Sequence, residues 1–331
     1  MNIDDIINSI DSNNLDIAFG RVVNISAVTL SAVGLDVAVG DIVRIESAQK
    51  LYTVLGMVTV LKDGLFVIVP FSFIDGFKIN DKVFLQRDGL TVKCGNGLLG
   101  RVVNALGDPI DHLGKIKDLD TNAPINKESM SPLDRGIIDK KFATGVKAID
   151  SMLTCGKGQK VGIFAGSGVG KSTLMGMIVQ GCEATIKVIA LVGERGREIP
   201  EFIHYNLNNN LENTVIVTAT SDESPLMRKY AAFTAMTIAE YFRDKGYDVL
   251  LMMDSVTRFA MAQREIGLST GEPPVSRGYP PSVFALLPQL MERAGNSKKG
   301  SITAFFTVLV DGDDLNDPIA DQSRSILDGH I

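Results

Sequence analysis

A glycine-rich segment near the middle of the chain contains the residue types that bind phosphate. An apolar run, residues 161–164, leads into Ala-Gly-Ser-Gly-Val-Gly-Lys-Ser at 165–172, and a helix-forming stretch, 173–180, follows. Glycines allow the backbone to turn so that successive amide groups face one anion, and the helix N-terminus adds its positive end. Lys171 is placed to reach the outer phosphates and Ser172 to ligate Mg²⁺. The segment predicts binding of a nucleoside triphosphate with Mg²⁺.

The glycine-rich segment departs from the strict phosphate-binding pattern at its first position, where Ala165 stands in place of glycine. Alanine is the smallest change available. A strand-to-helix turn that binds no ligand is the alternative for any glycine-rich loop ahead of a helix. The Gly170-Lys171-Ser172 ending, directly after an apolar run, favours phosphate binding.

An aspartate ends a later apolar run, residues 249–253. In phosphate-binding loop proteins, an acid at the end of a later strand holds the Mg²⁺, usually through a water molecule. Asp254 is the candidate for this role. The alternative is that Asp254 caps the N-terminus of a helix that begins near Ser255.

A second acidic candidate follows the apolar run at residues 187–192, where the sequence reads Gly-Glu-Arg-Gly-Arg-Glu over 193–198. A carboxylate at the carboxyl end of a strand beside the phosphate-loop strand is placed to orient a water toward the γ-phosphate. Glu194 is the candidate for that role. A surface loop of salt bridges is the alternative for so many charges.

Two kinds of secondary structure divide the chain. Short β-rich runs at 22–30, 42–46, 52–60, 65–69 and 82–85, separated by turn residues, predict a small closed barrel in an N-terminal domain, residues 1–93, with a flexible start. A proline-containing connector is predicted at 104–144. Apolar runs at 161–164, 187–192, 214–218, 249–253 and 302–309 then alternate with helical segments such as 225–245. This alternation predicts an α/β nucleotide-binding domain, residues 94–331, with a mostly parallel sheet.

Composition narrows the function further. The chain has 331 residues, 45% of them hydrophobic, and a net charge of −6. The acidic balance argues against nucleic-acid binding, and three separated cysteines indicate neither a disulfide framework nor a zinc site. Residues 1–15 lack the basic start and apolar core of a secretion signal, and no apolar run is long enough to cross a bilayer. We expect a cytoplasmic protein.

Four segments carry a resemblance to a known family. Residues 154–172, 193–198, 254–260 and 271–282 resemble the type III export ATPases, relatives of the catalytic β subunit of rotary ATP synthases. Within this family, the segments resemble the flagellar export ATPase. The resemblance extends from about Gly20 to the last residue and implies a RecA-like nucleotide-binding core.

The resemblance also implies roles for individual residues. Glu194 polarises the attacking water, Arg195 contacts the γ-phosphate, and Lys171 holds phosphate, which makes these three the catalytic set. Ser172 ligates Mg²⁺ while Asp254 and Glu198 order waters around it, and Arg258 braces the acidic cluster. The predicted nucleotide-binding residues are Ala165, Gly166, Ser167, Gly168, Val169, Gly170, Lys171, Ser172, Thr173 and Arg258.

The function implied by the resemblance is ATP hydrolysis that assists the unfolding and delivery of export substrates at the flagellar type III apparatus. The family forms hexameric rings with sites between subunits. Implied partners are a coiled-coil central stalk, a regulator of the ATPase, the export gate, and substrates with their chaperones, at the cytoplasmic face of the membrane. The loops at 273–281 and 311–317 resemble segments that face the ring's pore. Without the resemblance, the first is a rigid connector and the second a solvated turn.

Three other functions remain open from the sequence. The virulence injectisome ATPase shares every motif named above. A hexameric RNA helicase shares the ring core, and a non-catalytic ring subunit would bind nucleotide without hydrolysing it. The sequence ends at Ile331, before the region where relatives carry an adenine platform, an arginine finger and a helical C-terminal domain. An arginine finger accelerates hydrolysis by roughly 10³ to 10⁵, so we expect this chain alone to be weakly active or inactive.

Overall fold

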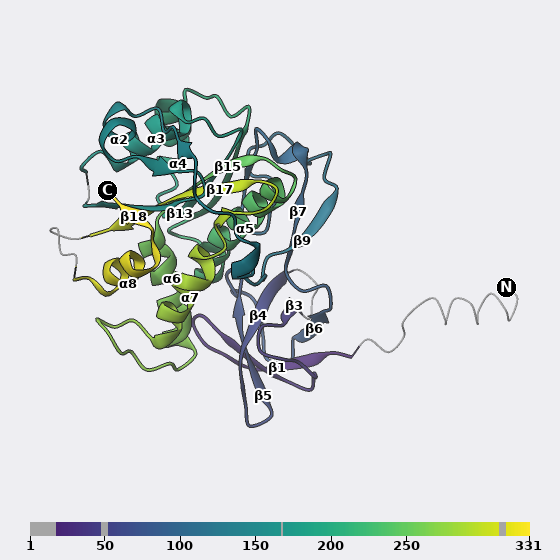
Figure 1. Ribbon diagram of the computed structural model, residues 1–331. Helices are drawn as coiled ribbons and strands as arrows, with labels where there is room; N and C mark the ends of the chain where they lie inside the picture. The colour runs from purple at the N-terminus through teal and green to yellow at the C-terminus, as the bar shows by residue number, and fades with distance from the viewer. Residues whose placement is uncertain (1–17, 48–51, 167, 311–315) are drawn as a thin grey trace, which may run out of the picture. The chain divides into compact units, whose positions relative to one another are not determined.

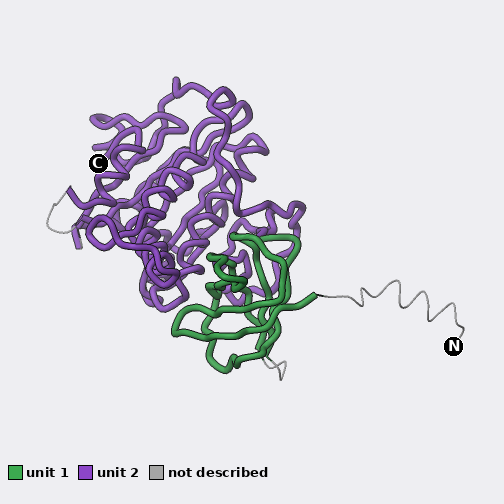
Figure 2. Tube along the Cα trace, turned by 90° about the horizontal axis from the view of Figure 1, so that it is seen from below, with its two compact units in different colours: residues 1–89 green, residues 90–331 purple. Residues whose placement is uncertain are grey.

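The chain forms two compact units, residues 1–89 and 90–331 (Figure 2). The computed structural model describes residues 18–47, 52–166, 168–310 and 316–331, so the expectations for residues 1–15 lie outside the described part. The units divide slightly before the boundary predicted between 93 and 94. The reason is that β7 (Thr91–Cys94) pairs antiparallel with β9 (Thr121–Pro124) and so belongs to the second unit.

The first unit is a closed barrel of six strands, as the short β-rich runs predicted. The order around the barrel is β1-β2-β5-β4-β3-β6. The strands are β1 (Gly20–Ile25), β2 (Leu30–Val33), β3 (Ile42–Glu46), β4 (Thr53–Lys62), β5 (Leu65–Pro70) and β6 (Lys82–Gln86). Side chains on alternate positions point inward, so that Val22, Leu30 and Ile68 are fully buried. These inward side chains form the core of the barrel.

One strand predicted in the barrel is wrong. The run at 22–30 is two strands, β1 and β2, joined by a tight turn from Ser26 to Thr29. The amide of Ser26 donates to the carbonyl of Thr29 at 2.9 Å, and the two hydroxyls lie 2.6 Å apart. The β-branched residues of this run predict one continuous strand, but hydrogen bonds between Ser26 and Thr29 form a turn within it.

The second unit is built on a parallel sheet in the order β18-β12-β17-β15-β13-β14-β8. Its strands are β8 (Val102–Val103), β12 (Lys160–Ala165), β13 (Ile186–Glu194), β14 (Thr214–Thr220), β15 (Asp248–Asp254), β17 (Ser301–Leu309) and β18 (Gly329–His330). A short strand, β16 (Gly295–Asn296), pairs antiparallel with β17. The five predicted strands are confirmed. Their central residues are almost all buried, as expected for a sheet covered on both faces.

Helices cover both faces of this sheet (Figure 1). One face carries α2 (Lys147–Met152), α3 (Lys171–Gly181) and α4 (Glu198–Glu201), and the other carries α5 (Pro225–Asp244), α6 (Val256–Ser269) and α7 (Pro281–Met291). The last helix, α8 (Pro318–Ile326), packs against β17 and β12. Ser224 caps α5 by accepting from the amide of Met227, and Pro225 occupies its first position. The helix predicted at 225–245 is confirmed.

The remaining elements are short. They are the 3₁₀ turns η1 (Asn96–Leu98) and η2 (Pro132–Asp134), the π-helical turn η3 (Phe202–Asn206), and the strand pair β10 (Lys141–Phe142) and β11 (Cys155–Gly156). Most of the predicted connector, 104–144, has no regular structure apart from β9, η2 and β10.

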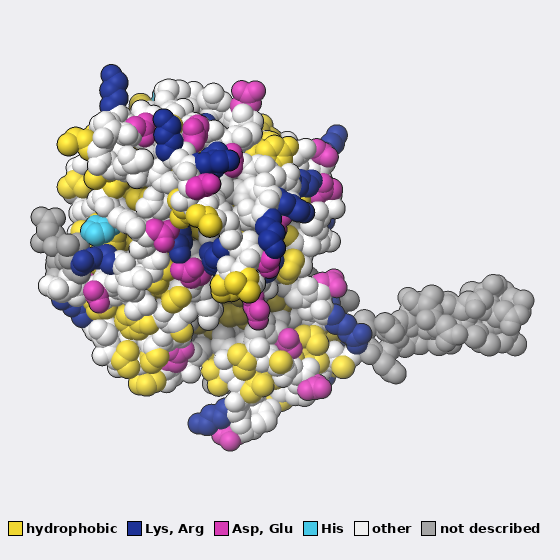
Figure 3. All heavy atoms as spheres, in the orientation of Figure 1, with side chains coloured by type: hydrophobic (Ala, Val, Ile, Leu, Met, Phe, Trp, Pro, Cys, Tyr) yellow, Lys and Arg dark blue, Asp and Glu magenta, His cyan; other side chains and the backbone are white. Residues whose placement is uncertain are grey.

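Charged side chains of both signs lie on the surface. Basic and acidic side chains are interspersed over the face shown in Figure 3, in keeping with a net charge of −6. Among the residues that the structure describes, no helix has the length and apolar character needed to span a bilayer.

Candidate active site

The glycine-rich loop connects the end of β12 to the start of α3. It turns through Gly168 (φ 78°) and Gly170 (φ 95°), of which Gly170 is the N-cap residue of α3. A Cβ at either position would have open space around it. Glycine is therefore required by the left-handed backbone and not by crowding. Ser167, one of the predicted nucleotide-binding residues, lies outside the described part of the chain.

Lys171, the first residue of α3, lies among acidic side chains. Its Nζ is 2.5 Å from Oδ1 of Asp254 and 4.0 Å from Oε1 of Glu194. All three side chains are at most 14% exposed. The structure therefore brings together the lysine and the two acids that the sequence singled out from three separate segments.

The strands that carry these acids do not lie where the sequence analysis placed them. Glu194 was predicted on a strand beside the phosphate-loop strand, and this is wrong, because β12 has β17 and β18 as its neighbours. Asp254 ends β15 and Glu194 ends β13, the second and third strands beyond β12 on the β17 side. The contact exists because the long lysine side chain reaches over the carboxyl end of β17.

Asp254 does not cap the helix that follows it. The hydroxyl of Ser255 accepts from the amide of Arg258 at 3.3 Å and is the N-cap of α6. The alternative role considered for Asp254 is therefore wrong, and its carboxylate points to Lys171 instead. Thr307, a fully buried residue of β17, donates its hydroxyl to Oδ1 of Asp254 at 2.7 Å. The carboxylate is thus held from two sides.

Glu194 lies beside Arg258. The Nε of Arg258 is 3.3 Å from Oε1 of Glu194, close enough for an ion pair, yet neither atom has a hydrogen-bond partner within the described residues. The Nη1 of Arg258 donates to the carbonyl of Gly193 at 2.5 Å. Gly193 has φ of 70°, and a Cβ there would lie 3.1 Å from the Cβ of Arg258. A glycine before Glu194 therefore permits the close approach of the arginine.

The environment of Glu194 favours its protonated form. Burial raises the pKa of Glu194 above its ordinary value, with further contributions from a hydrogen bond with Glu198 and from the charge of Asp254. The same hydrogen bond lowers the pKa of Glu198. Glu198 also pairs with Arg195 at 3.3 Å, and the Arg195 side chain is 64% exposed. Arg195 therefore faces solvent at the edge of the site, held by one ion pair.

Most of the predicted site residues line one cavity of about 320 Å³. Gly166, Gly168, Gly170, Lys171, Ser172, Thr173, Glu194, Arg195, Glu198 and Arg258 line it. Three predicted residues are not in its lining. Ala165 is buried at the end of β12, Val169 is 69% exposed, and Asp254 reaches the cavity through Lys171.

Three residues of this site were missed in the sequence. Leu309 and Val310 line the cavity, and Thr307 holds Asp254. All three are at the carboxyl end of β17, the strand that adjoins β12. The rule that ligands bind at the carboxyl ends of parallel strands would have found them, had the strand order been known.

A phosphate-binding loop, a buried lysine between two acids, and a doubly covered parallel sheet define the class of protein as a RecA-like nucleotide-hydrolysing enzyme. Comparison with known sequences gives the family. Residues 145–331 match the ATP synthase alpha/beta family, nucleotide-binding domain. The flagellum-specific ATP synthase of Helicobacter pylori strain J99 is 61% identical over 314 residues, covering 95% of this chain and 72% of that protein.

Two further relatives differ in the system that they serve. The flagellum-specific ATP synthase of Bacillus subtilis is 50% identical, and the type 3 secretion system ATPase of Xanthomonas euvesicatoria is 46% identical. Among solved structures, the assembled ATPase EscN of the enteropathogenic E. coli type III secretion system matches with a TM-score of 0.88 and 46% identity. The match covers 94% of this chain and 75% of EscN.

The chain therefore belongs to the ATP synthase alpha/beta family, among its flagellum-specific and type III secretion ATPases. This confirms the resemblance found in the sequence, the predicted fold and the prediction of an ATP-hydrolysing enzyme.

Proposed function

We propose that this chain is the ATP-hydrolysing subunit of a flagellar type III protein export apparatus. The observation that carries the proposal is that Lys171 and Glu194 line one cavity beside the glycine-rich loop, with Asp254 paired to Lys171 behind its lining. The flagellar assignment rests on identity, since the flagellar relative of Helicobacter pylori is 61% identical over 95% of this chain, whereas type III secretion ATPases are 46% identical over 95% and 55% identical over 73% of it.

Each residue of the cavity has a role in this proposal. The amides of residues 166–170 and the ammonium of Lys171 bind the outer phosphates of ATP. In its ionised form Glu194 orients the attacking water and takes up its proton, and the pKa raised by burial makes this carboxylate a stronger base. Arg258 fixes the position of Glu194. Arg195 contacts the γ-phosphate, and its exposed side chain lies at the edge of the site.

The donor atoms at the cavity also fit Mg²⁺. Ser172 offers a hydroxyl, and Asp254 and Glu198 offer carboxylates, which are the hard oxygen ligands that this ion prefers. The ion supplies charge neutralisation on the phosphates when bound. In our proposal Ser172 ligates it directly, and Asp254 and Glu198 hold waters around it.

Assembly follows from the relatives. EscN has been solved in assembled form and with its central stalk EscO, and we propose that this chain forms a hexameric ring with a stalk protein. The two loops predicted to face the pore lie close together at their ends, since Nη1 of Arg277 is 3.9 Å from Oδ2 of Asp317. Residues 311–315 of the second loop lie outside the described part. We further propose a location at the cytoplasmic face of the membrane, beside the export gate.

The proposed chemistry is tested by Glu194→Gln. Removing the proton acceptor while keeping its shape should lower the weak ATP turnover expected of this chain by roughly 10² to 10³, with the affinity for nucleotide changed by less than a few-fold. Steady-state phosphate release and equilibrium nucleotide binding measure the two quantities. Glu201→Gln is the matched control, because Glu201 is exposed on the neighbouring α4, and its turnover should equal that of the parent. If Glu194→Gln kept more than a tenth of the turnover, another group would be the base.

A further inference from the structure

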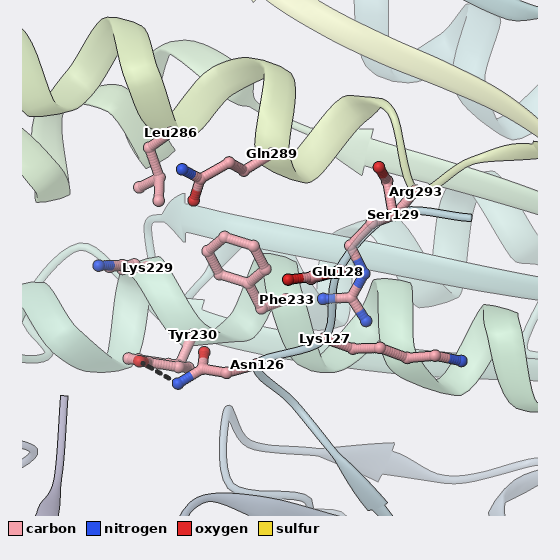
Figure 4. A pocket seen from close by; sticks show the side chains of 10 residues that line it. All are labelled: Asn126, Lys127, Glu128, Ser129, Lys229, Tyr230, Phe233, Leu286, Gln289 and Arg293. Atoms are coloured by element: carbon pink, nitrogen blue, oxygen red, sulfur yellow. Dashed lines mark hydrogen bonds between the residues drawn. The ribbon is translucent and has the colours of Figure 1, made fainter. Parts of the chain in front are cut away.

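A second cavity in the residues 90–331 unit is larger than the nucleotide cavity and shares no lining residue with it. Its volume is about 680 Å³. It lies between the start of α5, the end of α7 and the segment 126–129 (Figure 4). The residues that line it are Asn126, Lys127, Glu128, Ser129, Lys229, Tyr230, Phe233, Leu286, Gln289 and Arg293. The volume lies within the range of small-molecule sites, roughly 300 to 1,000 Å³.

Lys229 is a buried cation in the lining of this cavity. It is 9% exposed, and no acidic side chain of the described residues lies within ion-pair distance of its ammonium. Its Nζ lies 5.6 Å from the centroid of the Tyr230 ring. Burial lowers the pKa of Lys229 to about 8, although the charge of the Glu272 carboxylate opposes this effect. The ammonium is therefore still mostly protonated at neutral pH.

The other buried basic residues that the structure describes are all paired. Lys160 lies 2.7 Å from Glu292, Arg243 lies 2.8 Å from Asp244, and Arg293 lies 2.7 Å from Glu240. A buried charge without a counter-ion is unfavourable by several kcal/mol unless a partner is supplied. Lys229 is thus the one buried basic residue of the described chain that has no carboxylate within ion-pair distance.

The side chains around Lys229 divide the cavity into two ends. Figure 4 shows Lys229 and Gln289 on one side of the Phe233 ring, and Glu128 and Arg293 on the other. Arg293 is occupied by Glu240, Thr237 and the carbonyl of residue 125. Phe233 and Leu286 supply apolar surface between the ends. The Lys229 end is therefore cationic and the middle is apolar.

We propose that this cavity binds a small organic anion, whose carboxylate pairs with Lys229 and whose apolar body packs against Phe233 and Leu286. Pairing removes the unfavourable burial of a lone ammonium. Phe233 and Leu286 add the area-dependent gain of apolar contact. Because the site is separate from the glycine-rich loop, its occupancy does not depend on the proposed ATP chemistry.

Titration calorimetry of the full chain with 2-naphthoate tests the proposal, with 2-naphthamide as a neutral probe of the same shape. We expect the parent to bind naphthoate at least tenfold more tightly than naphthamide. Lys229→Met should weaken naphthoate binding at least tenfold and leave naphthamide unchanged. Lys127→Met is the matched control, because Lys127 lines the same cavity with an exposed side chain. It should change the affinity for naphthoate by less than threefold.

A second variant keeps the lysine and fills the space beside it. Leu286→Trp should abolish the binding of both probes, whereas inorganic phosphate, which lacks an apolar body, should not displace naphthoate from the parent. Circular dichroism and thermal melting confirm that both variants are folded. Equal binding of the two probes, equal losses in Lys127→Met and Lys229→Met, unchanged binding in Leu286→Trp, or displacement by phosphate would each overturn the proposal.

Discussion

Two buried lysines of the second unit lie in opposite electrostatic settings. Lys171 has Asp254 at 2.5 Å and Glu194 at 4.0 Å, whereas Lys229 has no carboxylate within ion-pair distance among the described residues. Around the nucleotide cavity, three basic side chains (Lys171, Arg195 and Arg258) face three acidic ones (Glu194, Glu198 and Asp254). The charge of Lys171 is therefore neutralised by neighbouring carboxylates, whereas the charge of Lys229 is not.

The presence or absence of carboxylates beside the lysine determines which kind of ligand each cavity can bind. The basic side chains of the nucleotide cavity are already paired with carboxylates. A polyphosphate that binds these basic side chains would leave the carboxylates without counter-ions, unless a metal cation binds together with it. The nucleotide cavity therefore suits a metal-bound triphosphate. The Lys229 cavity has a cation to offer by itself, so an anion is accepted there without a metal.

The largest effect that separates the two lysines should be on catalysis. Lys171→Met removes the charge that binds the outer phosphates, and we expect ATP turnover to fall by roughly 10² to 10³, as for loss of one preorganised electrostatic group. Phosphate release at saturating ATP measures it. Lys127→Met, which removes an exposed lysine of the same unit, should keep the parent turnover. If Lys229→Met lost as much turnover as Lys171→Met, the two lysines would serve a single site.

The free energy of unfolding should fall in Lys171→Met and rise in Lys229→Met. Lys171→Met leaves Asp254 and Glu194 buried without their cation, and we expect the free energy of unfolding to fall by about 3 to 5 kcal/mol. Lys229→Met removes an unpaired charge whose pKa is lowered from 10.5 to about 8, so the free energy of unfolding should rise by up to roughly 3 kcal/mol. Urea unfolding at pH 7 without nucleotide measures both.

The gain from Lys229→Met should depend on pH in a defined direction. Between pH 8 and 10.5 the unfolded chain keeps the proton on Lys229 while the folded chain loses it. The unfolded state then binds more protons, so the stability of the parent rises with pH across this window. The advantage of the variant should be complete below pH 8 and vanish above 10.5. A gain that persisted at pH 10.5 would mean that packing, and not charge, is responsible.

The sequence was sufficient for most strands of the core but not for their order. Each of the five predicted strands is a run of apolar residues that are buried on both faces, and such runs are recognisable without structure. The order of the strands in the sheet depends on which face of the sheet each connecting helix crosses, and the apolar runs carry no information about that. Placing Glu194 on a neighbouring strand was therefore wrong, and Thr307, Leu309 and Val310 went unnoticed. The edge strands β8 and β18, of two residues each, are too short to carry a pattern.

The Lys229 cavity was also beyond reach of the sequence, for a different physical reason. A helix over 225–245 was correctly predicted, but a lysine in a helix is almost always exposed. Its burial arises because α7 and the segment 126–129, distant in sequence, cover the start of α5. By contrast, the glycine-rich loop is a local signal, and all of its described residues except Ala165 and Val169 line the nucleotide cavity.

The smallest effect should come from the contact that positions Asp254. Thr307→Val replaces the hydroxyl that donates to Asp254 at 2.7 Å with a methyl group of the same size. A hydrogen bond to a charged group contributes about 1.5 to 3 kcal/mol. Since Lys171 still holds the carboxylate, we expect only about a tenfold fall in turnover, with the Mg²⁺ concentration for half-maximal activity raised and the KM for ATP unchanged.

Thr307→Ser separates positioning from packing in this experiment. Serine restores the hydroxyl but removes a methyl group from a fully buried position, so it should recover most of the turnover while lowering the free energy of unfolding by about 1 kcal/mol. Valine keeps the methyl group but not the hydroxyl, so it should not recover the turnover. If serine and valine lost turnover equally, Thr307 would act through packing of β17, and Asp254 would depend on Lys171 alone.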